Sequence, residues 1–172
     1  MAMTLEEVST ILNDIGFSHK LDKEDNVIIS AGGSSENRLA YFIRMREDGE
    51  MFDMAGRLLD ENTDQINAKG SEYTTELMAY LLLRNWETKF GTWEFDHNDG
   101  FISFAVEIPL EDNNLTKKQL QRITKIMISA SKEAGDIKSI LKTGALPLDG
   151  DDAAKRIAEL EAMLKALQSN GI

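Results

Sequence analysis

The chain has 172 residues, of which 42% are hydrophobic, and it carries a net charge of −11 from 30 acidic and 19 basic side chains. This length suffices for one sizeable hydrophobic core but scarcely for two. The sequence has no cysteine, which excludes disulfides, thiolate nucleophiles and cysteine-ligated metal sites.

The same features set expectations for compartment and partners. No stretch is long and apolar enough for a membrane span, and residues 1–7 lack the basic and then apolar order of a signal peptide, so we expect a cytoplasmic protein. The negative net charge repels phosphate backbones and anionic lipids, so we expect neither nucleic acid nor a membrane as a partner. Four basic residues cluster on one predicted helix, and we interpret them as a solvated face: Lys117, Lys118, Arg122 and Lys125.

The first predicted element is a helix from Thr4 to Ile15, along which apolar residues recur at spacings of three and four. Thr4 and Glu7 match a capping box, and Gly16 stands where a left-handed C-terminal cap is expected.

Strands are predicted next. A weak strand is expected near His19 and a clearer one over residues 27–31, followed by alternating residues 39–46 and a further strand over 51–59. Asp48-Gly49 predicts a two-residue hairpin turn between the last two. Without the weak strand near His19, we count three antiparallel strands after the first helix.

A second helix is predicted over residues 71–86, with Ser71 as its cap. Four of its residues share one face at helical spacing: Leu77, Tyr80, Leu81 and Arg84. A second hairpin follows, with strands over 88–96 and 101–110. Pro109 has no N–H to donate, so it should lie at an edge or at the end of a strand.

A long helix is predicted to open at Thr116, which forms a second capping box with Gln119, and its apolar stripe continues to Leu141. Gly135 predicts a kink or break. Residues 145–150 then predict a linker, since Pro147 and Gly150 interrupt helices.

The last predicted element is an amphipathic helix over residues 151–172. Its candidate protein-interaction residues form one seam: Ile157, Leu160, Met163, Leu164 and Leu167. Two heptads are too short to be stable alone, so this seam needs a surface to pack against. It either packs on its own domain or pairs with a second copy or another protein.

The order helix, three strands, helix, two strands, long helix predicts an α+β fold: a two-layer α/β sandwich whose antiparallel sheet has its helices on one face. We expect one such domain over residues 1–144, with the linker 145–150 and the C-terminal helix 151–172 after it.

The segment Leu81–Phe95, followed by Asp99-Gly100, Phe101–Leu110 and Leu115-Thr116, resembles the YbjN-like proteins, a family described as sensory transduction regulators. Through them the chain resembles the type III secretion chaperone-like fold, over about Thr4 to Leu141. The resemblance implies an α-β(3)-α-β(2)-α domain, commonly dimeric, whose relatives bind unfolded or extended protein segments through exposed apolar surface. The linker and helix after Gly144 depart from the secretion chaperones.

No catalytic or cofactor motif is found. His19 and His97 are the only histidines, neither has an evident nucleophile with an orienting acid, and Gly32–Glu36 lacks the final glycine of a nucleophile elbow. Residues 60–65 resemble the start of a calcium-binding loop, but Gln65 stands where glycine is needed. We therefore predict no enzyme, no cofactor and a solvated loop, with weak divalent-ion binding as the alternative there.

The sequence thus predicts a homodimeric interaction or regulatory module, chaperone-like, which recognises a protein segment by apolar surface and by added strand pairing. A small-ligand sensor and a hydrolase with dispersed catalytic residues are the alternatives. An enclosed pocket with convergent polar groups would indicate the sensor, and a cluster of strongly shifted pKa values the hydrolase.

Overall fold

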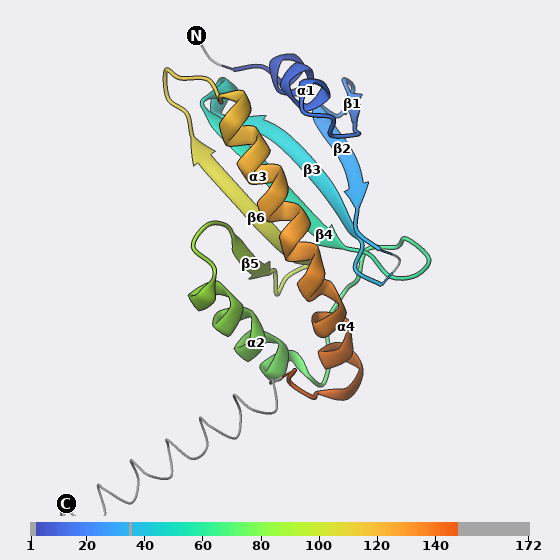
Figure 1. The fold of residues 1–172 in the computed structure, drawn as a ribbon. Helices are drawn as coiled ribbons and strands as arrows, with labels where there is room; N and C mark the ends of the chain where they lie inside the picture. Colours follow the sequence, from blue (N-terminus) through green and yellow to red (C-terminus); the bar gives the residue numbers. More distant parts are fainter. Residues whose placement is uncertain (1–2, 35, 148–172) are drawn as a thin grey trace, which may run out of the picture.

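The computed structural model describes residues 3–34 and 36–147. They form a mixed α and β domain with one antiparallel sheet in the order β1-β2-β3-β4-β6-β5. The helices lie on one face of this sheet, as predicted (Figure 1). The elements are α1 (Leu5–Asp14), β1 (Lys20–Asp22), β2 (Val27–Gly32), β3 (Leu39–Arg46), β4 (Met51–Leu58), α2 (Thr74–Glu87), β5 (Thr92–Phe95), β6 (Ile102–Pro109), α3 (Lys117–Ala130) and α4 (Ala134–Thr143).

Local signals set the ends of α1 and α3. The Thr4 side chain accepts from the Glu7 N–H and the Glu7 carboxylate accepts from the Thr4 N–H, which confirms the first capping box. Thr116 and Gln119 form the second in the same way. Gly16 has φ of +74°, the left-handed conformation predicted after the first helix.

The prediction of three strands between the first two helices is wrong by one. The weak strand near His19 is real: β1 pairs with β2 over three residues, from Lys20↔Ile29 to Asp22↔Val27. The Asp22 carboxylate accepts the backbone N–H groups of the turn that follows, at Glu24 and Asp25. A strand of three residues is too short to show a clear alternation of apolar and polar residues in the sequence, so the predicted count omits it.

The hairpin between β3 and β4 also differs from prediction. Arg46 pairs with Met51, so the connection has four residues, Glu47–Glu50, in place of the predicted two-residue turn. Glu47, Asp48 and Gly49 all have positive φ and form a 3₁₀ turn.

Two predicted starts are displaced toward the C-terminus. The N-cap of α2 is Tyr73, and Ser71 instead accepts a hydrogen bond from the Tyr73 N–H just before the helix. β5 begins at Thr92 and not at Thr88, because Gly91 turns the chain with φ of +90° against the Phe104 ring. Pro109 is the last residue of β6, which confirms its predicted place at the end of a strand.

The predicted break in the long helix lies just before Gly135. A 3₁₀ turn, Ser131–Glu133, separates α3 from α4, and the backbone stays right-handed helical through it. The two helices therefore run on as one interrupted rod across the sheet (Figure 1). The predicted C-terminal helix, 151–172, lies outside the described residues.

The core lies between this rod, α1, α2 and the sheet. Alternate residues of β4 face it, including Phe52, Met54 and Leu58. Tyr41 of β3 is buried beside Gly56, which has no side chain to displace its ring, and burial raises the pKa of Tyr41 to about 12.

The opposite face of the sheet carries charged side chains over a few apolar ones. The guanidinium groups of Arg44 and Arg57 each lie 5.8 Å from the Phe42 ring. Asp53, only 3% exposed, is paired with Arg46 at 2.5 Å. The guanidinium groups of these arginines cover this face of the sheet, where no second layer of helices or strands lies among the described residues.

Gly91 and Gly70 give a matched test of what fixes the start of β5. Both have positive φ, but a Cβ at Gly91 would lie 2.4 Å from Phe104 whereas a Cβ at Gly70 would meet nothing within 4 Å. Gly70→Ala should cost about 1 kcal/mol of unfolding free energy from backbone strain alone. Gly91→Ala should cost about 3 kcal/mol, because overpacking is added. Urea denaturation measures both, and equal losses would contradict the proposed role of the Phe104 contact.

Candidate protein-interaction surface

The outer face of α2 presents apolar side chains to solvent. Met78 is 49% exposed, Leu82 68% and Trp86 89%, at a spacing of four residues that aligns them along the helix. Thr75 and Ala79 complete this face, so no charged residue interrupts it. We call Met78, Leu82 and Trp86 the α2 stripe.

The area of the α2 stripe is large for a single surface feature. From these exposures and ordinary side-chain sizes, the three residues leave on the order of 400 Å² of apolar surface in water. Contiguous patches of this size on soluble proteins are commonly interaction sites. A tryptophan so exposed has no role in the core of its own domain.

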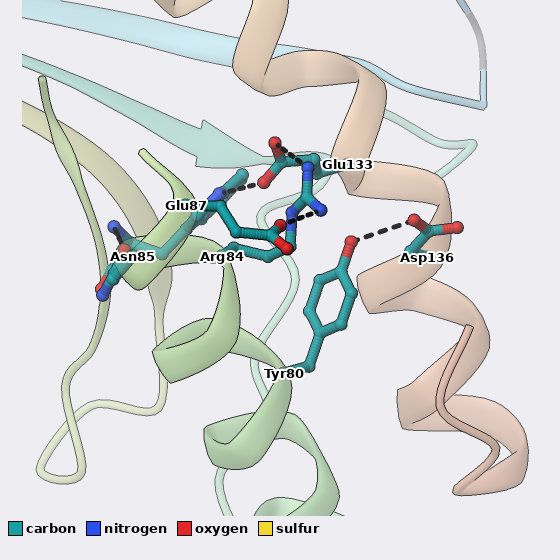
Figure 2. A network of polar contacts seen from close by, with 7 residues as sticks. Tyr80, Arg84, Asn85, Glu87, Glu133 and Asp136 are labelled. Carbon is teal, nitrogen blue, oxygen red and sulfur yellow. Dashed lines mark hydrogen bonds and ion pairs between the residues drawn. The ribbon is translucent and has the colours of Figure 1, made fainter. Parts of the chain in front are cut away.

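The inner face of α2 is fixed to the domain by packing and by polar contacts (Figure 2). Leu77, Tyr80 and Leu81 are buried, which confirms the predicted inner face. The Tyr80 hydroxyl donates to Asp136 of α4 at 2.9 Å. Burial, and then this carboxylate, raise the pKa of Tyr80 well above its usual range, so the phenol stays a donor at physiological pH.

Glu133, in the turn between α3 and α4, joins three elements. One carboxylate oxygen accepts from the Trp93 indole N–H at 2.6 Å and the other from Arg84 at 3.0 Å. Arg84 also pairs with Glu87 at 2.7 Å (Figure 2). The hydrogen bond to Glu133 is the main cause of the raised pKa of Arg84.

Asn85 connects the end of α2 to β5. Its side-chain amide donates to the Trp93 carbonyl at 2.9 Å, and its amide oxygen accepts from the Trp93 N–H at 2.7 Å. The side chain thereby replaces a neighbouring strand at this residue. Trp93 also packs edge-on against Phe104, with ring centroids 5.3 Å apart. These contacts hold α2 with its apolar stripe facing outward.

Arg84, Asn85 and Trp93 of this arrangement lie in the segment that carries the family resemblance, and a family model matches residues 4–136. The family is described as "Putative bacterial sensory transduction regulator". The chain belongs to the YbjN family.

The fold of one solved structure agrees with this assignment, and two further chains show a weaker similarity. YbjN from E. coli matches at 10% identity with a TM-score of 0.59, over 81% of this chain and 94% of that one. A chain of the HopA1–SchA chaperone–effector complex matches at 12% identity and a TM-score of 0.49, over 73% and 88%. A chain of the ExsC–ExsE complex matches at 15% identity and a TM-score of 0.49, over 78% and 95%. No curated protein matches the chain significantly.

Sequence reasoning did not find the α2 stripe in this member of the YbjN family. The candidates that it named, Ile157, Leu160, Met163, Leu164 and Leu167, lie outside the described residues. The signal was present: α2 has the buried face that was predicted, and a second apolar row at i, i+4 and i+8 on the other side. A helix that is apolar on two sides needs two partners.

Two contacts of His19 were also missed. Its Nδ1 lies 2.8 Å from the Phe17 carbonyl oxygen and its Nε2 lies 2.7 Å from the Ser9 hydroxyl. The carbonyl accepts from Nδ1–H, which leaves Nε2 to accept from Ser9. A backbone oxygen stands where a catalytic triad has a carboxylate, and the pair joins α1 to the start of β1.

The calcium-like loop uses its first carboxylate internally. Asp60 accepts the N–H groups of Asn62 and Asp64 at 2.8 and 2.9 Å. Among residues 3–34 and 36–147, no cluster of three or more histidine, aspartate or glutamate side chains could hold a metal ion. Nor does any helix in those ranges have the length and hydropathy to cross a membrane.

Glu133→Ala tests whether the carboxylate bridge holds α2 in place. It leaves the Trp93 indole and a buried part of Arg84 without partners, so it should cost about 1–3 kcal/mol of unfolding free energy. The matched control is Glu87→Ala, which removes the other carboxylate on Arg84. Glu87 is 43% exposed against 18% for Glu133, so its loss should cost less than about 1 kcal/mol. Denaturant unfolding measures both, and a control as costly as Glu133→Ala would contradict the bridging role.

Proposed function

We propose that this protein is a non-enzymatic, cytoplasmic protein-interaction module of regulatory or chaperone-like kind, and that it pairs with a second copy through the α2 stripe. The observation that carries the proposal is the exposed, charge-free row of Met78, Leu82 and Trp86 on a helix whose other side is fixed by Glu133 and Asn85.

The size of the surface supports pairing. A stable interface buries about 800 Å² per partner, and the α2 stripe supplies roughly half of that as apolar area. At about 25 cal/mol per Å², its burial contributes on the order of 10 kcal/mol per copy, comparable with the cost of association. A face without charges also fits a second copy of itself, because self-pairing brings no like charges together.

The alternatives find less support. The hollow beside α4 has a volume of about 840 Å³, is open to solvent and is bordered by charges of both signs, including Asp60, Glu61 and Lys142. Lys138 in its wall already donates to the Glu36 carbonyl at 2.6 Å. A hollow this open to solvent does not favour a small-ligand sensor. For a hydrolase, Ser9 and His19 lack an orienting acid.

The C-terminal seam of Ile157, Leu160, Met163, Leu164 and Leu167 is proposed as a second surface in the same association. Its spacing supplies an amphipathic face that a helix of this length must bury to be stable.

Leu82→Asp tests the pairing of α2. A carboxylate at the centre of the stripe would be buried without a partner, so the dissociation constant of the dimer should rise about a hundredfold or more. Sedimentation velocity at a series of concentrations measures it, with circular dichroism to show that the variant is folded.

The matched control is Ile128→Asp. Ile128 of α3 is 47% exposed, so the same kind of change is made on a helix surface away from the stripe. It should leave the dissociation constant unchanged. A wild-type chain that sediments as a monomer, or equal effects of the two variants, would refute the pairing.

Leu164→Asp tests the C-terminal seam in the full chain. If the seam contributes to the same association, the dimer should weaken about tenfold while the domain stays folded. Light scattering across a dilution series measures the change. Ser169→Asp, which adds the same charge outside the seam, is the control, and an unchanged dimer in Leu164→Asp would confine the association to α2.

A further inference from the structure

A groove lies between the outer edge of β6 and α3, on the helix side of the sheet. It has a volume of about 540 Å³, and its walls include Phe90, Ile108, Ile123 and Ile126. Phe90 is 43% exposed there. The groove is thus apolar within and open to solvent.

One wall of the groove is a strand edge whose partner stops early. β5 pairs with β6 only from Phe95↔Ile102 to Thr92↔Ala105, and Gly91 then turns the chain away. The outer edge of β6 has no strand partner over residues 106–109 within the described part of the chain.

The backbone of Glu107 points to this open edge. On the other side of β6, Leu110 N–H donates to Glu50, and hydrogen-bonding residues alternate along an antiparallel strand. Leu110 and Ile108 therefore bond toward β4, whereas the N–H and C=O of Glu107 face outward. A strand edge beside an apolar groove suits an extended segment better than a helix.

The helix that forms the opposite wall, α3, carries a basic row beside the groove. α3 contains Lys117, Lys118, Arg122 and Lys125 and no acidic residue, in a chain of net charge −11. Arg122 borders the groove, and Lys118 and Lys125 lie one turn to either side of it. Lys117 has a carboxylate, Asp14, at 4.0 Å, but no ion pair reaches the other three among the described residues.

We propose that this groove binds an extended acidic segment of a partner protein. The segment adds to β6 as a strand through the backbone of Glu107 and inserts an apolar side chain between Phe90, Ile123 and Ile126. Carboxylates two residues before and after that side chain face the basic row Lys118, Arg122 and Lys125. The proposal deepens the protein-binding role proposed above but does not depend on pairing through α2.

The geometry also defines the other face of the segment. Side chains of a strand alternate, so the residues between the carboxylates lie on the face of the sheet that Glu107 occupies. Neutral residues belong there, because acidic ones would be repelled by Glu107.

A designed peptide tests the proposal, with the sequence Thr-Glu-Thr-Leu-Thr-Glu-Thr, acetylated and amidated at its ends. Titrated into the full ¹⁵N-labelled chain, it should shift the amide signals of residues 106–108, 110 and 119–126. A peptide with lysine in place of both glutamates should bind at least about tenfold more weakly. N-methylation of the backbone amides that face β6 should weaken binding similarly.

Two charge-reversal variants separate the groove from general electrostatics. Arg122→Glu should weaken binding of the glutamate peptide by about tenfold or more, whereas Lys117→Glu, the same reversal at the paired lysine away from the groove, should change it less than about twofold. Leu82→Asp, which tests the α2 surface, should leave peptide binding unchanged. No binding of the glutamate peptide, or equal effects of the Arg122 and Lys117 variants, would overturn the proposal. A monomeric chain that still binds the peptide would refute only the pairing through α2.

Discussion

The carboxylate of Glu133 is the contact on which the arrangement of the outer half of the domain depends. It lies in the turn between α3 and α4 and accepts from Trp93 of β5 and Arg84 of α2. The strand β5 and the helix α2 are thereby both fixed to the rod formed by α3 and α4. A charged acceptor in a half-buried site strengthens both hydrogen bonds, since little water competes for it.

From this contact follow the two candidate surfaces. One side of α2 is hydrogen-bonded to the rest of the domain through Tyr80, Arg84 and Asn85. The side that carries Trp86 must therefore face away from the domain. β5 starts only after Gly91 has turned the chain, and Asn85 and Glu133 hold Trp93 there, so half of the edge of β6 stays open. One surface is an uncharged helix face, and the other is an apolar groove beside a basic row, so they suit different partners.

The sequence predicted those features that neighbouring residues determine by themselves. The capping boxes of Thr4 and Thr116, the left-handed Gly16 and the strand end at Pro109 all depend on a few adjacent residues, and all are confirmed. The fold class was also predictable, because hydrophobic period distinguishes helix from strand along most of the chain. The four-residue hairpin was not, since Asp48-Gly49 permits positive φ without fixing the length of the loop.

The candidate sites were harder to predict because they depend on distant residues. Trp93 and Glu133 are 40 positions apart, and neither is unusual in its own segment. Leu82 and Trp86 look like core residues until the contacts of Tyr80 and Arg84 show which side of α2 is inside. The basic row of α3 was visible as charge, but its meaning changes once an apolar groove lies beside it.

The face of the sheet opposite the helices is covered by arginine side chains and not by a second layer of the residues that the structure describes. Phe42 lies under two guanidinium groups, and Arg57 also covers Phe101 at 4.8 Å. Arginine keeps its charge at any physiological pH. Its planar guanidinium group can cover an aromatic ring while its N–H donors stay hydrogen-bonded to water. Stacking of a second sheet here would have to strip water from these permanent charges. The domain can therefore keep one side of its sheet uncovered at high concentration without assembling face to face.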